Sequence, residues 1–410
     1  MACVHERGCG HGLRALTEQR DRWGADRALP VRTTGGRVGS IFEPLSDRML
    51  ADPFAVYARL RAEDPVHRHE GLGAWVVTRH DDCTRVLKDS TTFGSDPRSL
   101  GIPLPDAVLS IHTLDPPEHA AVRHRFVDAL RGQEVRGWAD GVREAADELV
   151  GRVDGVVDFV TEVAKPLALR AVCSLYGVPA PDDEEPLRAA SRTLVLGLDS
   201  GLAPERREPS LAAREALNGM IERWRPAARP GGVLTAVPPG GQVLRNSARA
   251  VFDAGYSTTA DLLGNVVAWL TAGGPWRGDL AAVDGRAAEE LIRLAGPVQV
   301  VSRRCKAEVD LRGRRLARGD VVIVALAAAN RDPDVFPDPD TADFTRGPNP
   351  HLALGRGTHS CFGGHLGKQV LLALLHALGG VAGIEAAGVP VQRPTGTQRG
   401  LDRLPVRLLR

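Results

Sequence analysis

The chain has 410 residues, of which 43% are hydrophobic and 25% charged, and its formal net charge is +1. That balance is typical of a globular protein with ample material for a core, and it gives no reason to expect nucleic acid as a partner. The longest apolar run covers residues 321–329, far short of the ~20 residues of a membrane helix, and the N-terminus has no apolar signal core. Six cysteines without a framework spacing argue against a disulfide scaffold. We therefore expect a cytoplasmic protein that acts without a membrane.

Residues 1–40 are rich in glycine, arginine and polar residues and show little periodicity. They predict a mobile leader ahead of a single domain over residues 41–410. A zinc site is an alternative for this leader, with the ligands Cys3, His5, Cys9 and His11. Ligand pairs this close in sequence lack the separation usual in a closed tetrahedral site, so a tail without metal is the better prediction.

The first part of the domain predicts two helices, a strand and a long loop. The pattern favours a helix over residues 54–63, a strand over residues 74–78 and a second helix from about residue 80, where two aspartates suit a first turn. Residues 93–113 contain several glycines and prolines, which predict a long irregular loop. Loops of this length inside a compact domain are often functional.

A third helix is predicted to start at Pro116, Pro117 and Glu118, because proline and acidic residues favour the first helical turn. His119 and Arg123 lie four residues apart and therefore share one face of this helix. Taken alone, the pair is a solvated helix face.

Residues 138–229 predict amphipathic helices that are broken at residues 177–179 and 226–232, and a long helix follows over residues 243–271. The middle of this long helix contains the run AGYSTTA at residues 254–260. Glycine weakens a helix interior, and threonine hydroxyls bond back to carbonyls. The composition therefore favours a helix that opens a groove against a ligand.

A charged pair and a strand follow. Glu290 and Arg293 lie three residues apart on one helical face, which alone is a weak signal. Residues 297–301 are enriched in β-branched side chains, as expected for a strand.

The stretch HLALGRGTHSCFGG at residues 351–364 surrounds Cys361 with glycines and precedes an apolar helical pattern. Glycines allow a tight fold and a close approach of the backbone to a flat group. Backbone N–H groups and a helix N-terminus favour a thiolate, which is a ligand for iron or another soft metal. The alternative is a buried free cysteine in a glycine-rich loop, because free cysteines are often core residues.

Residues 354–363 resemble the heme-binding loop of the cytochromes P-450, the heme-thiolate monooxygenases, although Leu354 stands where the family normally has phenylalanine. The resemblance implies Cys361 as the axial thiolate and His359 as a donor to a heme propionate. It also places Leu354, Gly355 and Gly363 in the heme-binding loop.

Further segments resemble the same family in unbroken order over residues 50–410. His119 and Arg123 match a propionate-binding pair, and Arg303 matches a propionate-binding arginine. Glu290 and Arg293 match a structural pair that is completed by a later arginine, here Arg346.

The run at residues 254–260 resembles the oxygen-binding stretch of the family, which implies that Ala254, Gly255, Ser257 and Thr258 are catalytic positions. Thr258 matches the alcohol that hydrogen-bonds oxygen. Ser257 stands where the family usually has an acid, and a serine cannot hold an exchangeable proton at neutral pH as a carboxylate does. Asp253 and Asp261 lie four residues to either side of Ser257 and are candidates for the missing acid, although ordinary structural hydrogen bonds are the more common use of such residues.

The resemblance implies a mainly α fold with small β-sheets, shaped like a triangular prism, with heme b between the long helix and the cysteine loop. It also implies a small-molecule substrate, O₂ and a separate ferredoxin or flavodoxin-type electron donor, because no cysteine spacing fits an iron–sulfur cluster. The donor is expected to dock near Cys361, where Arg356, His365 and Lys368 offer positive charge. We expect a monomer.

Three functional hypotheses follow. The first is a monooxygenase that oxidises an intermediate of secondary metabolism. The second is a heme-thiolate enzyme that catalyses oxidative coupling or ring closure without net oxygen insertion, and the absence of an acid at Ser257 motivates it. The third is a non-catalytic heme sensor, which the retained Thr258 disfavours, because a mere binder needs no hydroxyl on the oxygen side.

Overall fold

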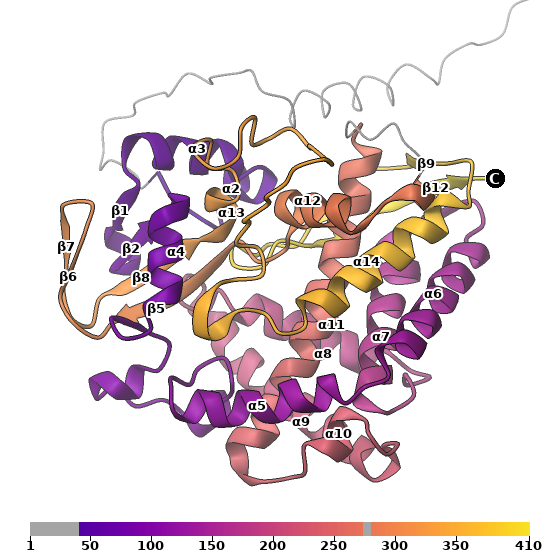
Figure 1. The fold of residues 1–410 in the computed structure, drawn as a ribbon, viewed down its shortest axis with the longest axis horizontal. Helices are drawn as coiled ribbons and strands as arrows, with labels where there is room; N and C mark the ends of the chain where they lie inside the picture. The colour runs from indigo at the N-terminus through magenta and orange to yellow at the C-terminus, as the bar shows by residue number, and fades with distance from the viewer. Residues whose placement is uncertain (1–40, 274–279) are drawn as a thin grey trace, which may run out of the picture.

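The structure of the chain is a computed structural model that describes residues 41–273 and 280–410. The predicted leader and its zinc alternative lie outside the described residues. The described part is mainly helical with small β-sheets, as the sequence predicts. The predicted long helix is present as α11 (Gly241–Thr271) and runs through the middle of the molecule (Figure 1).

Helices make up most of the described chain. Besides α11, they are α2 (Asp47–Ala51), α3 (Phe54–Glu63), α4 (His80–Lys88), α5 (Glu118–Arg131), α6 (Val135–Arg152), α7 (Lys165–Tyr176), α8 (Glu185–Gly197), α9 (Arg207–Trp224), α10 (Val233–Ala236), α12 (Gly285–Ala295), α13 (Leu326–Ala329) and α14 (Gly364–Gly379). The predicted helix over residues 54–63 coincides with α3, and the predicted starts near residues 80 and 118 are those of α4 and α5.

The strands are short and lie on both sides of α11 (Figure 1). They are β1 (Val66–His69), β2 (Ala74–Val77), β3 (Phe93–Gly94), β4 (Val156–Asp158), β5 (Val300–Cys305), β6 (Val309–Leu311), β7 (Arg314–Leu316), β8 (Val321–Ala325), β9 (Gly383–Ala386), β10 (Val391–Gln392), β11 (Leu401–Arg403) and β12 (Pro405–Leu409).

The largest sheet has the order β1-β2-β8-β5-β3, in which only the β2–β8 pair is parallel. Smaller sheets have the order β4-β12-β9, β6-β7 and β10-β11.

Helix α11 is buried on most of its circumference. Leu263 and Val267 belong to a core cluster that also contains residues of α6, α7, α12 and α14. Phe252 and Tyr256 belong to a second cluster, with residues of α5, α7, α8, α9 and α10. A helix with core on both sides does not need a single apolar stripe, which explains how α11 includes polar residues beside its apolar ones.

Two sequence predictions need correction. The strand expected over residues 297–301 begins only at Val300, because the backbone before it bonds to the turn near the C-terminus, with the Gln299 N–H donating to the Thr397 carbonyl at 2.9 Å. The region predicted as helix from residue 138 is interrupted by β4 and by a π-helical turn, Val160–Ala164. The predicted loop over residues 93–113 is irregular apart from β3 and short 3-10 turns.

No helix within residues 41–273 and 280–410 combines the length and the apolar character needed to cross a bilayer.

Candidate active site

The loop before α14 owes its shape to two glycines. Gly355 and Gly357 have φ angles of 67° and 71°, a region that other residues rarely adopt. A Cβ on Gly357 would also collide with the backbone carbonyl of Leu87 in α4. The sequence predicted glycines that let the backbone approach a flat group, and for Gly357 the close approach is to α4.

Cys361 is exposed, whereas the other cysteines of the described residues, Cys83, Cys173 and Cys305, are buried. The Cys361 N–H donates to the Leu354 carbonyl at 2.8 Å, which closes the loop and orients the side chain. Surrounding protein raises the pKa of the Cys361 thiol, and the N–H groups of Gly363 and Gly364 and the charge of Arg123 partly offset that effect. A side chain that is surrounded by protein and still accessible lines a concave surface, so the alternative of a buried core cysteine is wrong.

Histidines and arginines from three elements converge near Cys361. The ring centroids of His119 on α5 and His359 lie 4.2 Å apart, and Nε2 of His359 is buried without a hydrogen-bond partner. The Arg123 guanidinium lies 4.9 Å from the ring centroid of Phe362. Burial lowers the pKa of His359 to about 3, and Arg303 on β5 is the largest charged contributor to this shift. The structure therefore brings together the four residues that the resemblance assigned to the propionates.

The middle of α11 has the local geometry expected from its sequence. The Thr258 hydroxyl donates to the Ala254 carbonyl at 2.6 Å, the back-bond that loosens a helix. A Cβ on Gly255 would lie 3.2 Å from Cγ2 of Val172, so this glycine faces α7. Ser257 is 8% exposed. Of the four predicted catalytic positions, Gly255 therefore packs against the neighbouring helix.

The two acids beside Ser257 differ in their partners. Asp261 forms an ion pair with Arg393 and accepts a hydrogen bond from Nε2 of Gln398 at 2.7 Å, so it ties α11 to the turn between β10 and β11. Asp253 accepts a hydrogen bond from the Ser191 hydroxyl at 2.5 Å. Burial raises the pKa of Asp253 to about 6. Asp253 is therefore an acid with a raised pKa, and Asp261 is committed to its ion pair with Arg393.

Comparison with known proteins decides the family. A family model described as Cytochrome P450 matches residues 286–378. Cytochrome P450 monooxygenase PikC of Streptomyces venezuelae is 32% identical over 395 residues, which cover 88% of this chain and 92% of that protein. The 6-deoxyerythronolide B hydroxylase of Saccharopolyspora erythraea is 32% identical over 406 residues, or 88% of this chain and 98% of that protein. The chain belongs to the cytochrome P450 family.

Solved structures agree. The crystal structure of CalO2 has a TM-score of 0.79 and 30% identity, covering 90% of this chain and 98% of that one. The structure of CYP109E1 from Bacillus megaterium also has a TM-score of 0.79, and at 23% identity it shows the fold alone. The relatives are named monooxygenases and hydroxylases, so this P450 is an oxidoreductase, and the hypothesis of a non-catalytic heme sensor is not supported.

The cofactor of the P450 family is heme b, and the residues of this site fit it. The accessible sulfur of Cys361 supplies a single soft ligand, and within residues 41–273 and 280–410 no group of three or more His, Cys, Asp or Glu side chains forms another metal site. The unpartnered Nε2 of His359 and the charges of Arg123 and Arg303 suit the two carboxylates of this cofactor.

The scaffold of this P450 site rests on the predicted trio. Glu290 and Arg293 are fully buried and bond to each other at 2.7 and 2.8 Å, and Nε of Arg346 reaches Glu290 at 3.2 Å. Asn349 also donates to Glu290 at 3.0 Å. Because residue 349 lies just before the cysteine loop, the trio connects α12 to that loop as predicted.

A second ionic group beside the trio was missed from the sequence. Glu289 accepts hydrogen bonds from Nζ of Lys368 and from Nε2 of His351, both at 2.7 Å. These contacts lower the pKa of Glu289 to about 2. Lys368 was expected to offer positive charge to an electron donor, and its pairing with Glu289 reduces the charge that it presents. The sequence did offer one indication of this pairing, because Lys368 lies on the first turns of α14, one turn from the cysteine loop.

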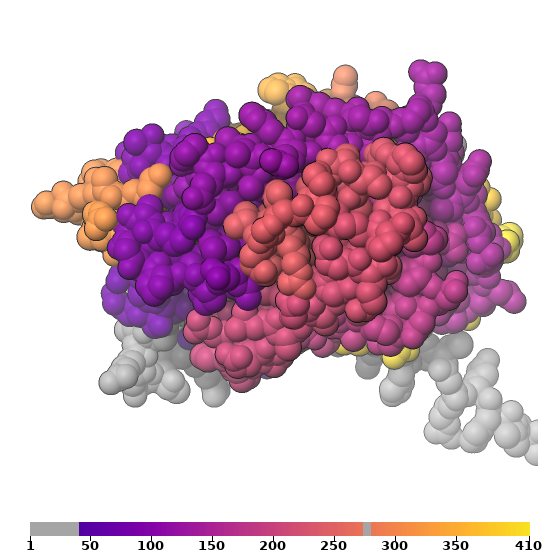
Figure 2. Space-filling view, turned by 90° about the horizontal axis from the view of Figure 1, so that it is seen from below, coloured from indigo at the N-terminus to yellow at the C-terminus, as the bar shows by residue number. Residues whose placement is uncertain are grey.

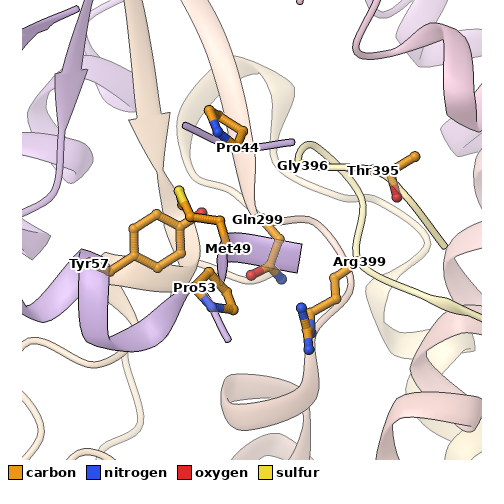
Figure 3. A pocket seen from close by; sticks show the side chains of 8 residues that line it. All are labelled: Pro44, Met49, Pro53, Tyr57, Gln299, Thr395, Gly396 and Arg399. Atoms are coloured by element: carbon orange, nitrogen blue, oxygen red, sulfur yellow. The ribbon is translucent and has the colours of Figure 1, made fainter. Parts of the chain in front are cut away.

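A small cavity lies between the first residues of the domain and the turn that ends at Arg399. Figure 3 shows its lining, which includes Tyr57 and Gln299. Its volume of about 10 Å³ holds no more than a single water. Oε1 of Gln299 is buried without a protein partner. Buried polar atoms beside a small cavity commonly bind a water molecule. This cavity is therefore not a substrate site.

Proposed function

We propose that this P450 oxidises a small-molecule intermediate of natural-product biosynthesis by inserting one oxygen atom from O₂. One observation carries the proposal: an accessible Cys361 lies beside His119, His359, Arg123 and Arg303, a group that fits a thiolate-held heme. The relatives support the substrate class, since one is a 6-deoxyerythronolide B hydroxylase and another is the 20-oxo-5-O-mycaminosyltylactone 23-monooxygenase of Streptomyces fradiae.

Each residue has a proposed role toward the cofactor. The Cys361 thiolate holds the iron, and the N–H groups of Gly363 and Gly364 stabilise the negative sulfur. The donors to the propionates are His119, Arg123, Arg303 and His359. Leu354 and Gly355 shape the loop, and a Cβ on Gly364 would clash with Leu354, which fixes this apolar side chain against the start of α14. A heme held by these residues would supply the activation of O₂, in which two electrons and two protons are consumed, one oxygen atom enters the substrate and the other leaves as water.

The residues of α11 hold and transfer the protons that the reaction consumes. Thr258 holds its hydroxyl proton toward the Ala254 carbonyl and exchanges that bond for one to a ligand on the open side of the helix. Ser257 relays a proton but does not store one at neutral pH. Asp253, with a pKa near 6, is able to store one, whereas Asp261 is held by Arg393.

Electrons come from a separate ferredoxin or flavodoxin-type protein, and we propose that the chain acts as a monomer. The proposed docking face surrounds the cysteine loop and includes Arg356 and the exposed His365. Lys368 adds less to this face than the sequence suggested, because Glu289 neutralises it.

A second function remains supported by one observation. Ser257 replaces the acid of the oxygen-side helix, and an enzyme with slow proton delivery is suited to coupling or ring closure, in which oxygen is not retained. The two functions differ in the fate of the oxygen atom, which makes them separable by experiment.

The test uses the heme-loaded full-length protein with a surrogate electron donor. Macrolactones and other natural-product intermediates are screened by the shift of the heme Soret band, and each binder is then incubated with isotope-labelled O₂. We expect a product that contains one labelled oxygen, with Thr258→Ala reducing its yield roughly 10–100-fold and releasing more peroxide. The neighbouring Thr259→Ala serves as the matched control and should retain the yield. A coupled or cyclised product without label, or turnover of no binder, would contradict oxygen insertion.

A further inference from the structure

Two arginines on neighbouring helices, one buried and one half-buried, have no role in the account above. They are Arg249 on α11 and Arg214 on α9, here called the arginine pair. We propose that the arginine pair binds a carboxylate of the substrate, so that this P450 selects anionic molecules. This proposal rests on the oxygenase function and names the substrate class for it.

The position of the arginine pair follows from helix packing. A hydrogen bond of 3.0 Å between Asn218 on α9 and Asn246 on α11 fixes the two helices side by side. Arg214 lies one turn from Asn218, and Arg249 lies one turn from Asn246. In the space-filling view, the purple segment that includes α5 and the red segment that includes α9 both contribute to the molecular surface (Figure 2).

Arg249 is the strongest single observation. Its side chain is 3% exposed, and neither Nε nor Nη2 has a hydrogen-bond partner. A buried guanidinium usually has its donors satisfied, because an unpaired buried charge is costly. A carboxylate would fill this need, since the planar fork of an arginine matches its two oxygens.

The local acid does not meet that need. Asp253 lies one turn after Arg249 on the same face of α11, but its carboxylate accepts from Ser191 on α8, and within the described part of the chain it forms no ion pair with either arginine. The cluster therefore has two positive charges and one negative charge. Such a balance favours an anionic ligand over a neutral one and disfavours a cation.

His112 shows that the cluster borders open space. The residue is solvent-exposed, yet surrounding protein and the charges of Arg249 and Arg214 lower its pKa to about 4. A ring with both properties lines a concave surface. His112 belongs to the long irregular loop over residues 93–113, for which its length indicated a functional role, so the concavity and the arginine pair adjoin that loop.

Helix geometry also gives the length that a ligand needs to extend from Arg249 to Thr258. Arg249 and Thr258 are nine residues apart on α11, about 13 Å along the helix axis. A carboxylate at Arg249 and an oxidised carbon near Thr258 therefore require an extended apolar molecule of medium length. Octanoate, dodecanoate and hexadecanoate bracket that length and are suitable probes, each with its methyl ester as the uncharged match.

The experiment measures dissociation constants of these three pairs by calorimetry on the heme-loaded full-length protein. We expect at least one carboxylate to bind about ten- to a hundredfold more tightly than its ester, the effect of a hydrogen-bonded charge. Arg249→Met and Arg214→Met should each reduce that preference. Arg245→Met is the matched control, because Arg245 lies on the same helix and pairs with Glu215 at the surface, and it should retain the preference. No preference in the parent protein, or a preference that survives Arg249→Met, would overturn the proposal.

Thermal unfolding supplies a second readout. If Arg249 has no ionic partner until a ligand binds, replacing it by methionine removes an unpaired buried charge. The melting temperature of the ligand-free protein should then stay unchanged or rise. A marked fall would show that Arg249 is a structural group and would contradict the proposal. Failure of the oxygenase function would instead appear in the fate of labelled O₂, which none of these binding measurements reports.

Discussion

The two sides of the proposed heme site treat buried charge in opposite ways. Under the cysteine loop, Glu290 is bonded to Arg293, Arg346 and Asn349, and the neighbouring Glu289 is bonded on both oxygens. Around the arginine pair, Arg249 has donors without partners and Asp253 has a raised pKa. The comparison teaches that paired charges hold the loop that carries Cys361, whereas unpaired charges keep binding capacity for a ligand.

The largest effect on stability is expected at Glu290. Glu290→Ala leaves two arginines buried without their partner, which costs ~3–5 kcal/mol of unfolding free energy. We expect little heme-loaded protein, measured from the ratio of heme absorbance to protein absorbance and from the melting temperature. Glu308→Ala is the control, because Glu308 pairs with Arg315 at the exposed surface and its loss should change almost nothing. A normal heme content in Glu290→Ala would remove the structural half of the comparison.

A smaller effect of opposite sign is expected at Asp253. Because burial raises the pKa of Asp253 from 3.8 to about 6, the folded protein binds the proton more tightly than the unfolded chain. This carboxyl therefore contributes stability at pH below about 4 that is lost as the pH rises to 6. Above that pH, Asp253→Asn should be more stable than the parent by roughly 2–3 kcal/mol, and near pH 4 the difference should vanish.

Denaturant unfolding at about pH 4.5 and about pH 8 measures the unfolding free energies of Asp253→Asn and of the parent protein, and their difference gives the Asp253 effect. Asp261→Asn is the matched control on the same helix, and it should lose stability at pH 8 because it weakens the pair with Arg393. If Asp253→Asn were destabilising at pH 8 as well, the charges on this side would be paired like those under the cysteine loop, and the contrast would disappear.

The sequence predicted the cysteine loop and the ion pair beneath it well, because their residues lie close together in sequence or belong to recognisable motifs. Gly355, Gly357 and Cys361 lie within seven residues of one another, and Glu290 and Arg293 lie within one helical turn. The fold followed from the resemblance, and α3, α5 and α11 were placed by caps, prolines and periodicity. The start of β5 was misplaced because the 297–299 backbone bonds to a turn about 100 residues later.

The charged and polar residues around the arginine pair could not be predicted in the same way. Arg214, Ser191 and Arg249 come from three helices, and each is unremarkable in its own sequence window. Only tertiary packing shows that Arg249 is buried without partners, or that Asp253 bonds to Ser191 while Asp261 is held by Arg393. The pairing of Lys368 with Glu289 was missed for the same reason, since the two residues are 79 positions apart.

The central claim is that Cys361 holds the heme iron as a thiolate, and the reduced carbon monoxide adduct tests it most directly. We predict a red-shifted Soret band for the parent protein and for Cys305→Ser, whose cysteine is buried in the sheet core. Cys361→Ser should lose that band while the protein remains folded. A red-shifted band that persists in Cys361→Ser would show that another residue supplies the thiolate and would contradict the account.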